Sequence, residues 1–139
     1  MQNFIKRYSQ AEDGATAVEF ALVAVAFMTL VFGIMETGRI MWVQNAIQYG
    51  IENAARYAIV NEGASDFELE EVATDSLAAM SVASAPLEMT VTTFNQNDTD
   101  FVQIDATYSY SPMVTSFLPE GFISPTLSAT TITPLNFPD

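Results

Sequence analysis

A long uncharged apolar run near the start of the chain limits what this sequence can fold into. Residues 20–35 contain no charged side chain, and extending the run back to Ala15 adds only Glu19 as an ionisable group. The extended run has 21 residues, close to the roughly 20 that a helix needs to cross about 30 Å of hydrocarbon. A buried core helix is the alternative, but a chain of 139 residues has little other apolar mass to surround one. The run therefore predicts a membrane-spanning helix.

The residues on either side of the run distinguish between kinds of export segment. A cleavable secretory signal carries small residues just after its apolar stretch, whereas here Glu36 and Arg39 follow. Lys6 and Arg7 precede the run. A signal anchor, with a cytoplasmic N-terminus and an exported C-terminal part, therefore fits the flanks better than a conventional signal peptide does.

The charges divide the chain into two parts. All four basic side chains lie at or before Arg56, and the rest of the chain is purely acidic, giving a net charge of -13. This charge repels phosphate backbones, so nucleic-acid binding is not expected. The absence of His and Cys excludes Ser-His-Asp triads, Cys nucleophiles and the usual zinc sites. Because no carboxylate pair is marked for acid-base chemistry, we expect neither an enzyme nor a cofactor.

Glu19 lies at the start of the apolar run, where an ionised carboxylate is costly. Gly14 comes five positions earlier and Phe20 follows, so residues 14–20 read G-A-T-A-V-E-F. This stretch resembles the processing site of type IV prepilins and pseudopilins, whose peptidase cuts after the Gly and leaves Glu as the fifth residue. The resemblance places the cut between Gly14 and Ala15.

Cleavage at that position has a physical rationale. It would create an ammonium group at Ala15, one helical turn from the Glu19 carboxylate at i+4. The positive end of the helix dipole favours the same carboxylate. In a filament, Glu19 could instead pair with the amine of a neighbouring subunit and set the axial register. The alternative is that Glu19 only snorkels to the membrane interface.

Three motifs in order narrow the resemblance to one family. They are GATAVEFALV beginning at Gly14, a G-x-x-E-x-G-R motif and an A-A-R motif. The second consists of Gly33, Glu36, Gly38 and Arg39, and the third of Ala54, Ala55 and Arg56. Together they resemble the TadE-like proteins, pseudopilins of the tight adherence (Flp) pilus system, over residues 14–58.

The resemblance implies a role in pilus assembly as a minor component. The protein would be a single-pass bacterial inner-membrane protein, with its head in the periplasm or outside the cell, and could enter the pilus. Its implied partners are the prepilin peptidase, other pilins or pseudopilins, inner-membrane assembly proteins and lipid. A membrane-anchored exported binding domain unrelated to pili remains the alternative.

The helix is expected to continue beyond the membrane as an amphipathic stalk. Apolar residues recur at helical spacing up to Val60, at Ile40, Val43, Ile47, Ile51, Ala54 and Ala58. Two oppositely charged pairs share a helix face, Glu36 with Arg39 and Glu52 with Arg56. The simplest interpretation is that both pairs stabilise the helix weakly. Glu36 and Arg39 could also fix the depth of the helix in the membrane or contact a partner helix. We therefore expect a cytoplasmic leader over residues 1–14 and a transmembrane and stalk helix over 15–61.

Residues 62–139 predict a small exported α+β head. Ser65 and Glu68 form a capping box before a short amphipathic helix that runs toward Pro86. Alternation of period two then predicts a hairpin from Leu87 to Tyr110 with its turn at residues 95–100. A long loop follows, marked by Pro112, Pro119, Gly121 and Pro125. Residues 126–133 supply a third strand, which gives a three-stranded antiparallel sheet packed on the stalk.

The hairpin turn is the candidate metal site of the head. Asn95, Asn97, Asp98 and Asp100 gather oxygen ligands that could hold calcium. The EF-hand pattern fails, however, because the sixth position has no Gly and the twelfth no Glu. Turns are also rich in Asn and Asp for backbone reasons, so no metal ligand is assigned.

Overall fold

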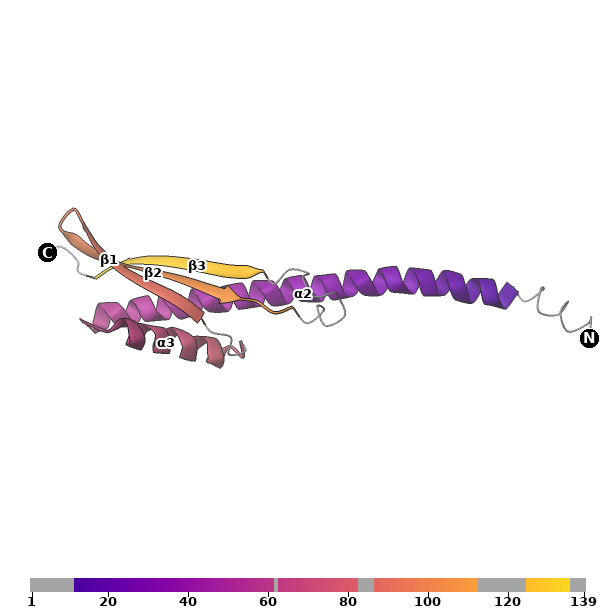
Figure 1. Ribbon diagram of the computed structural model, residues 1–139, viewed down its shortest axis with the longest axis horizontal. Helices are drawn as coiled ribbons and strands as arrows, with labels where there is room; N and C mark the ends of the chain where they lie inside the picture. The colour runs from indigo at the N-terminus through magenta and orange to yellow at the C-terminus, as the bar shows by residue number, and fades with distance from the viewer. Residues whose placement is uncertain (1–11, 62, 83–86, 113–124, 136–139) are drawn as a thin grey trace, which may run out of the picture. The chain divides into compact units, whose positions relative to one another are not determined.

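The computed structural model describes residues 12–61, 63–82, 87–112 and 125–135. Its elements, in chain order, are α2 (Glu12–Val60), α3 (Asp66–Ala79), β1 (Leu87–Gln96), β2 (Thr99–Ser109) and β3 (Thr126–Pro134) (Figure 1). The chain divides into two compact units, Met1–Thr37 and Gly38–Asp139, so the boundary falls within α2. The predicted α+β class, with a long helix, a short helix and a three-stranded antiparallel sheet, is confirmed.

The long helix α2 begins three residues before the predicted start at Ala15 and ends, as predicted, at Val60. The prediction placed the start at the expected cleavage point, but Gly14 alone weakens a helix by about 1 kcal/mol and does not stop it. At the other end, the backbone N–H of Asn61 donates to the Tyr57 carbonyl at 2.9 Å. Gly63 then takes a φ of 85°, a left-handed conformation that glycine adopts without strain.

The short helix α3 begins where the capping box predicted it. The Ser65 hydroxyl accepts the backbone N–H of Glu68 at 3.3 Å, and the Glu68 carboxylate accepts the backbone N–H of Ser65 at 2.8 Å. The Ser65 hydroxyl also donates to that carboxylate at 2.8 Å. Because the charged carboxylate accepts both bonds, chiefly the one from the Ser65 backbone, they lower the pKa of Glu68. The capping-box prediction is therefore confirmed.

The predicted end of α3 near Pro86 is wrong, because the helix ends at Ala79. Ser81 adopts a φ of 58°, and its N–H donates to the Ala78 carbonyl at 3.0 Å. The next N–H, from Val82, reaches back to the Leu77 carbonyl at 3.1 Å. These two bonds make a Schellman motif, with Ser81 in the place usually taken by Gly. Pro86 lies outside the described residues.

The hairpin of β1 and β2 has the predicted alternation but a tighter turn. Gln96 pairs with Thr99, so only Asn97 and Asp98 connect the strands, whereas the prediction gave the turn six residues. Both have positive φ, 52° and 65°, as a type I′ turn requires. This turn matches the twist of the flanking strands, which explains why pairing continues to its edge.

The predicted third strand is confirmed as β3, which pairs antiparallel with β2 in the order β1-β2-β3. Leu135 donates its N–H to the Asp100 carbonyl at 2.8 Å, so the odd-numbered residues of β3 bond to β2. The even-numbered residues consequently direct their N–H and C=O groups to the sheet edge. There the Gln44 side chain of α2 donates to the Ser128 carbonyl at 2.7 Å. The predicted loop over residues 113–124 lies outside the described residues.

The core of the second unit lies between the sheet and the second half of α2 (Figure 1). The predicted helical stripe is confirmed: Ile40 is partly buried, and the other members are buried, namely Val43, Ile47, Ile51, Ala54 and Ala58. The inner face of the sheet contributes Leu87, Val102, Ile104, Ala106, Tyr108, Leu127 and Ala129. Among the described residues no polar or charged residue is fully buried. This half of α2 is therefore the apolar support of the head.

Candidate functional site

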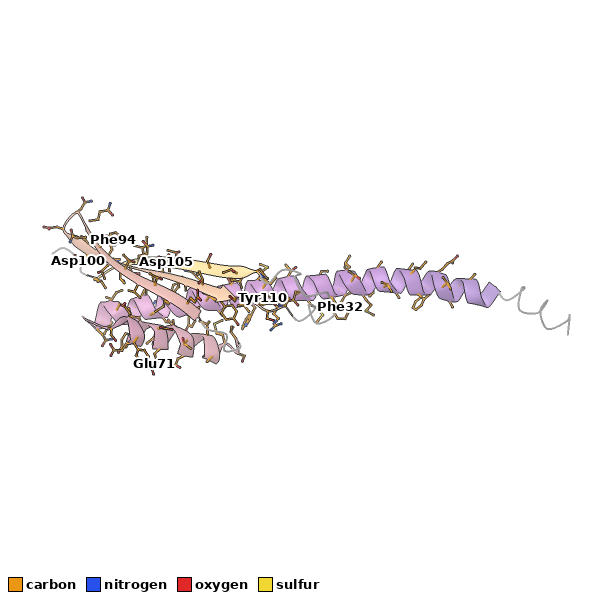
Figure 2. All side chains as sticks on the ribbon, in the orientation of Figure 1. Phe32, Glu71, Phe94, Asp100, Asp105 and Tyr110 are labelled. Carbon is orange, nitrogen blue, oxygen red and sulfur yellow. The ribbon has the colours of Figure 1, made fainter. Side chains whose placement is uncertain are left out.

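The first half of α2 exposes its apolar side chains on all sides. From Val18 to Met35 the large apolar side chains other than Val31 are 50–74% exposed, with Phe32 and Phe20 at the two limits, and Val31 has intermediate exposure. Figure 2 shows Phe32 among the side chains that project from this half of the helix. By length and composition, α2 is the one helix of the described part that could span a membrane, with a mean hydropathy of 2.3 in its most apolar window. Such a surface requires lipid or other helices as its neighbours.

Two threonines in the first half of α2, Thr29 and Thr37, satisfy their hydroxyl groups within the helix. Thr29 donates to the Val25 carbonyl at 2.8 Å, and Thr37 donates to the Gly33 carbonyl at 2.9 Å. Both bonds join residues four apart, so neither hydroxyl needs water or a second chain. This arrangement suits hydrocarbon, where an unsatisfied polar group is costly.

The residues of the predicted processing site lie together in the first turns of α2. Gly14, Ala15, Glu19 and Phe20 are all exposed. A methyl group built on Gly14 would meet no atom within 4 Å. Ala15 and Glu19 are therefore one helical turn apart on an open surface, as the i+4 argument requires. The cleavage itself and the pairing of Glu19 stay predictions.

The G-x-x-E-x-G-R motif crosses the boundary between the two units, so its members are described separately. A methyl group built on Gly33 or on Gly38 would meet no atom within 4 Å. Arg39, in the second unit, lies beside the ring of Tyr110, with its Cζ 5.4 Å from the ring centroid. That distance is within the range of cation–π attraction. The motif therefore brings its one cation against the head.

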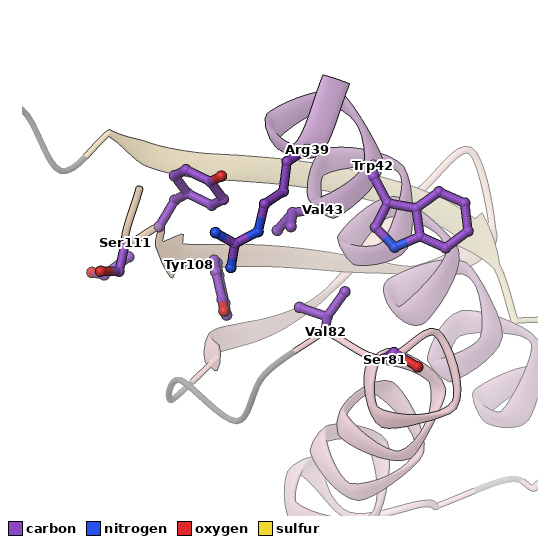
Figure 3. A pocket seen from close by; sticks show the side chains of 9 residues that line it. Arg39, Trp42, Val43, Ser81, Val82, Tyr108 and Ser111 are labelled. Atoms are coloured by element: carbon purple, nitrogen blue, oxygen red, sulfur yellow. The ribbon is translucent and has the colours of Figure 1, made fainter. Parts of the chain in front are cut away.

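Arg39 also lines a pocket of the second unit (Figure 3). The pocket has a volume of about 200 Å³, and its lining consists of Arg39, Trp42, Val43, Ser81, Val82, Tyr108, Ser109, Tyr110 and Ser111. Nη1 of Arg39 is buried and has no hydrogen-bond partner in the described part of the chain. Trp42 donates its ring N–H to the Met80 carbonyl at 3.3 Å, which connects α2 to the end of α3. The sequence analysis singled out Arg39 but did not foresee a pocket.

The A-A-R motif serves packing at its first two positions. Ala54 and Ala55 are 0% and 2% exposed, and Arg56 is exposed. Small side chains at these positions let neighbouring elements approach the helix closely. The Glu52 carboxylate accepts a hydrogen bond from Gln48 at 2.9 Å, and its predicted pairing with Arg56 stays a prediction.

Gly50 was not predicted as a functional or packing residue, but it marks a close approach of α2 and α3. A methyl group built there would lie 2.5 Å from Cδ1 of Leu77 and 3.0 Å from the Ala73 carbonyl oxygen. Nearby, Asn53 donates to the Ser76 hydroxyl at 3.1 Å. A Gly inside an amphipathic helix was the available signal, because its low helix propensity requires a packing reason.

The candidate calcium turn uses its polar side chains locally. Asn95 donates its side-chain amide to the Asp100 carboxylate at 2.7 Å, and all four predicted oxygen donors are exposed. Asn97 and Asp98 occupy the left-handed positions of the turn, a conformation that Asn and Asp tolerate well. The described residues contain no cluster of three or more acidic side chains fit to hold a metal. The left-handed backbone conformation of the turn thus explains why it contains Asn and Asp.

Comparison with protein families identifies the segment that carries the three motifs. Residues 14–56 match the family model of TadE-like proteins. This segment is TadE-like. Searches among curated proteins and among solved structures give no match. The TadE-like segment, residues 14–56, contains every residue assigned to the processing site, the helix-end motif and the stalk motif, and the predicted resemblance is confirmed.

Proposed function

We propose that this protein is a TadE-like pseudopilin that assists assembly of a type IV-like (Flp) pilus as a minor component. In this proposal, a prepilin peptidase removes the leader by cutting between Gly14 and Ala15. The observation that carries the proposal is the match of residues 14–56 to the TadE-like family. The same residues form a helix with one uniformly apolar half and one half that supports a folded head.

The proposed mechanism is assembly without catalysis. The exposed apolar half of α2 would first lie in the lipid of a bacterial inner membrane and then exchange lipid contacts for contacts with other pilin helices. Both environments match its surface, because the side chains are apolar all round and the threonine hydroxyls are already bonded. The head would lie on the exported side and select neighbouring subunits.

The proposal gives Glu19 a specific task during assembly. After cleavage, the amine of Ala15 would lie one turn from this carboxylate, or the amine of a neighbouring subunit would take that place. In an apolar setting, the attraction between the two charges is much stronger than in water. Pairing would thus let the charged end of the helix enter an apolar filament core.

A substitution at Gly14 tests the proposal. Gly14→Val should prevent cleavage, because a peptidase site that accepts only Gly has no room for a side chain. Co-expression with the cognate prepilin peptidase should then leave a precursor about 1.5 kDa heavier than the processed chain, taking roughly 110 Da for each of the fourteen leader residues. Immunoblotting measures the difference.

Gly33→Val is the matched control, since Gly33 also has open space around its Cα but lies outside the processing site. It should be cleaved like the natural chain. If Gly14→Val were cleaved normally, the processing assignment would fail. The protein would then be better described as a membrane-anchored exported binding domain unrelated to pili.

A further inference from the structure

The guanidinium of Arg39 is a cation in a pocket that does not satisfy all of its donors. Nη1 is buried without a hydrogen-bond partner among the described residues, and on one side the group faces the ring of Tyr110. The guanidinium carries a positive charge and offers donors but no acceptor. A buried donor of this kind needs a hydrogen-bond acceptor, and the positive charge of the guanidinium favours an anionic oxygen in that role.

The rest of the lining suits a phosphate group. Ser81 and Ser111 also line the same pocket of about 200 Å³, and a serine hydroxyl can donate to a phosphate oxygen. The planar fork of an arginine binds phosphate through two parallel hydrogen bonds. Figure 3 shows the Arg39 guanidinium directed away from α2 and toward Tyr108.

The position of Arg39 in the sequence indicates where a phosphate would come from. Arg39 follows Met35, the last residue of the apolar run, by four positions, about 6 Å along a helix. The headgroup layer of a bilayer begins within this distance of the hydrocarbon. In the second unit, Trp42, which lines the pocket, is 54% exposed, and Trp is enriched at membrane interfaces.

We infer that the Arg39 pocket binds the phosphate of a phospholipid headgroup at the membrane surface. The inference rests on the apolar run lying in a membrane, and it does not depend on cleavage at Gly14. Bound phosphate satisfies Nη1 of Arg39 and holds the base of an acidic head against a surface that its net charge would otherwise repel. A lipid held at this position fixes the depth of α2 in the bilayer.

The single tryptophan of the chain, Trp42, lines the pocket and can report on its occupancy. The full-length protein in dodecyl maltoside micelles, which carry no phosphate, is titrated with phosphatidylglycerol while Trp42 fluorescence is recorded. We expect a saturable change. Diacylglycerol with the same acyl chains should produce none, and inorganic phosphate should reach half-saturation only at a concentration at least tenfold higher.

Variants assign the response to the guanidinium. Arg39→Gln should raise the half-saturating mole fraction of phosphatidylglycerol at least tenfold. Arg39→Lys should give an intermediate value, because an ammonium keeps the charge but not the fork. Arg56→Gln removes the same charge from an exposed position and should change the value by less than twofold. Native mass spectrometry of retained lipid provides a second readout that does not depend on Trp42.

Several results would overturn the inference. Equal responses to diacylglycerol and phosphatidylglycerol would show that headgroup phosphate is not recognised. Equal half-saturation by inorganic phosphate would identify a site for free phosphate. Unchanged lipid binding in Arg39→Gln, combined with lost pilus assembly, would point to a carboxylate of a partner protein as the occupant. Cleavage at Gly14 is scored separately by immunoblot, so this inference and the pseudopilin proposal can fail independently.

Discussion

The two halves of α2 have different surroundings. Between Val18 and Met35 every large apolar side chain except Val31 is at least 50% exposed, whereas Val43, Ile47 and Ile51 are at most 5% exposed under the sheet. The first half is apolar on every face, and the second is apolar on one stripe. One end of a single helix can thus suit an apolar environment such as hydrocarbon, while the other end packs against a protein core. The distribution of apolar residues around the helix distinguishes the two halves.

The largest expected effect of a single substitution concerns Glu19, the only carboxylate in the apolar run from Ala15 to Met35. Glu19→Gln should still be inserted and cleaved at Gly14, yet pilus assembly should be lost. The amide keeps the size of the side chain but cannot neutralise a poorly solvated amine. Electron microscopy of piliation and an immunoblot of the processed chain measure the two effects separately.

Glu71→Gln is the matched control in the other region, because Glu71 is exposed on α3 (Figure 2). It should leave piliation unchanged. Normal piliation in Glu19→Gln would show that Glu19 merely tolerates its position at the interface. Loss of cleavage would instead show that the peptidase recognises Glu19. The proposed role of Glu19 in assembly would then be without support.

A smaller effect is expected from adding a side chain to a glycine in each half. Gly50→Leu should lower the free energy of unfolding of the head by about 1–3 kcal/mol through overpacking, because a Cβ there meets Leu77 and the backbone of Ala73. Gly33→Leu has open space around it and should leave the unfolding of the head unchanged. Denaturant titration in micelles, followed by circular dichroism, measures both variants. Equal stabilities would show that the α2–α3 contact at Gly50 is not close.

The smallest expected effect is a pH dependence of the stability of the head. The Ser65 bonds lower the pKa of Glu68, and the hydroxyl of Thr130, followed by the amide of Gln103, lowers the pKa of Asp105. A carboxylate with a lowered pKa in the folded state stabilises the fold above its unfolded-state pKa. That contribution disappears as the pH falls through the folded-state pKa. Stability should therefore decline in acid, below the ordinary carboxylate range.

Ser65→Ala should make that decline shallower, since it removes the hydroxyl bonds to Glu68. Ser128→Ala, at an exposed serine of β3, should keep the natural slope. Thermal unfolding between pH 7 and pH 3 compares the three proteins. Identical slopes for the natural chain and Ser65→Ala would show that the capping box does not perturb the titration of Glu68.

Local signals explain which parts of the fold could be predicted from the sequence. The stripe from Val43 to Ala58 and the capping box at Ser65 act within a few residues of one another, and both are confirmed. The end of α3 was misplaced because Ser81 takes a left-handed conformation that glycine usually supplies. Sequence gave no sign that a Schellman motif would form there.

Contacts between distant segments explain what the sequence analysis missed. The pocket at Arg39 combines α2, the residues after α3 and the end of β2, so no spacing along the chain reveals it. Gly50 likewise matters because Leu77, which is distant in the sequence, packs against it in the fold. The motifs of the TadE-like segment were recognisable because they lie in one continuous helix.

The N-terminal residue of the mature protein tests the central proposal most directly. The natural chain is expressed with its cognate prepilin peptidase, extracted from the membrane fraction and analysed by intact mass and N-terminal peptide mapping. Processing predicts a chain that begins at Ala15, with the Glu19 carboxylate one turn from the new amine. A chain that still begins at Met1 under those conditions would contradict the pseudopilin account.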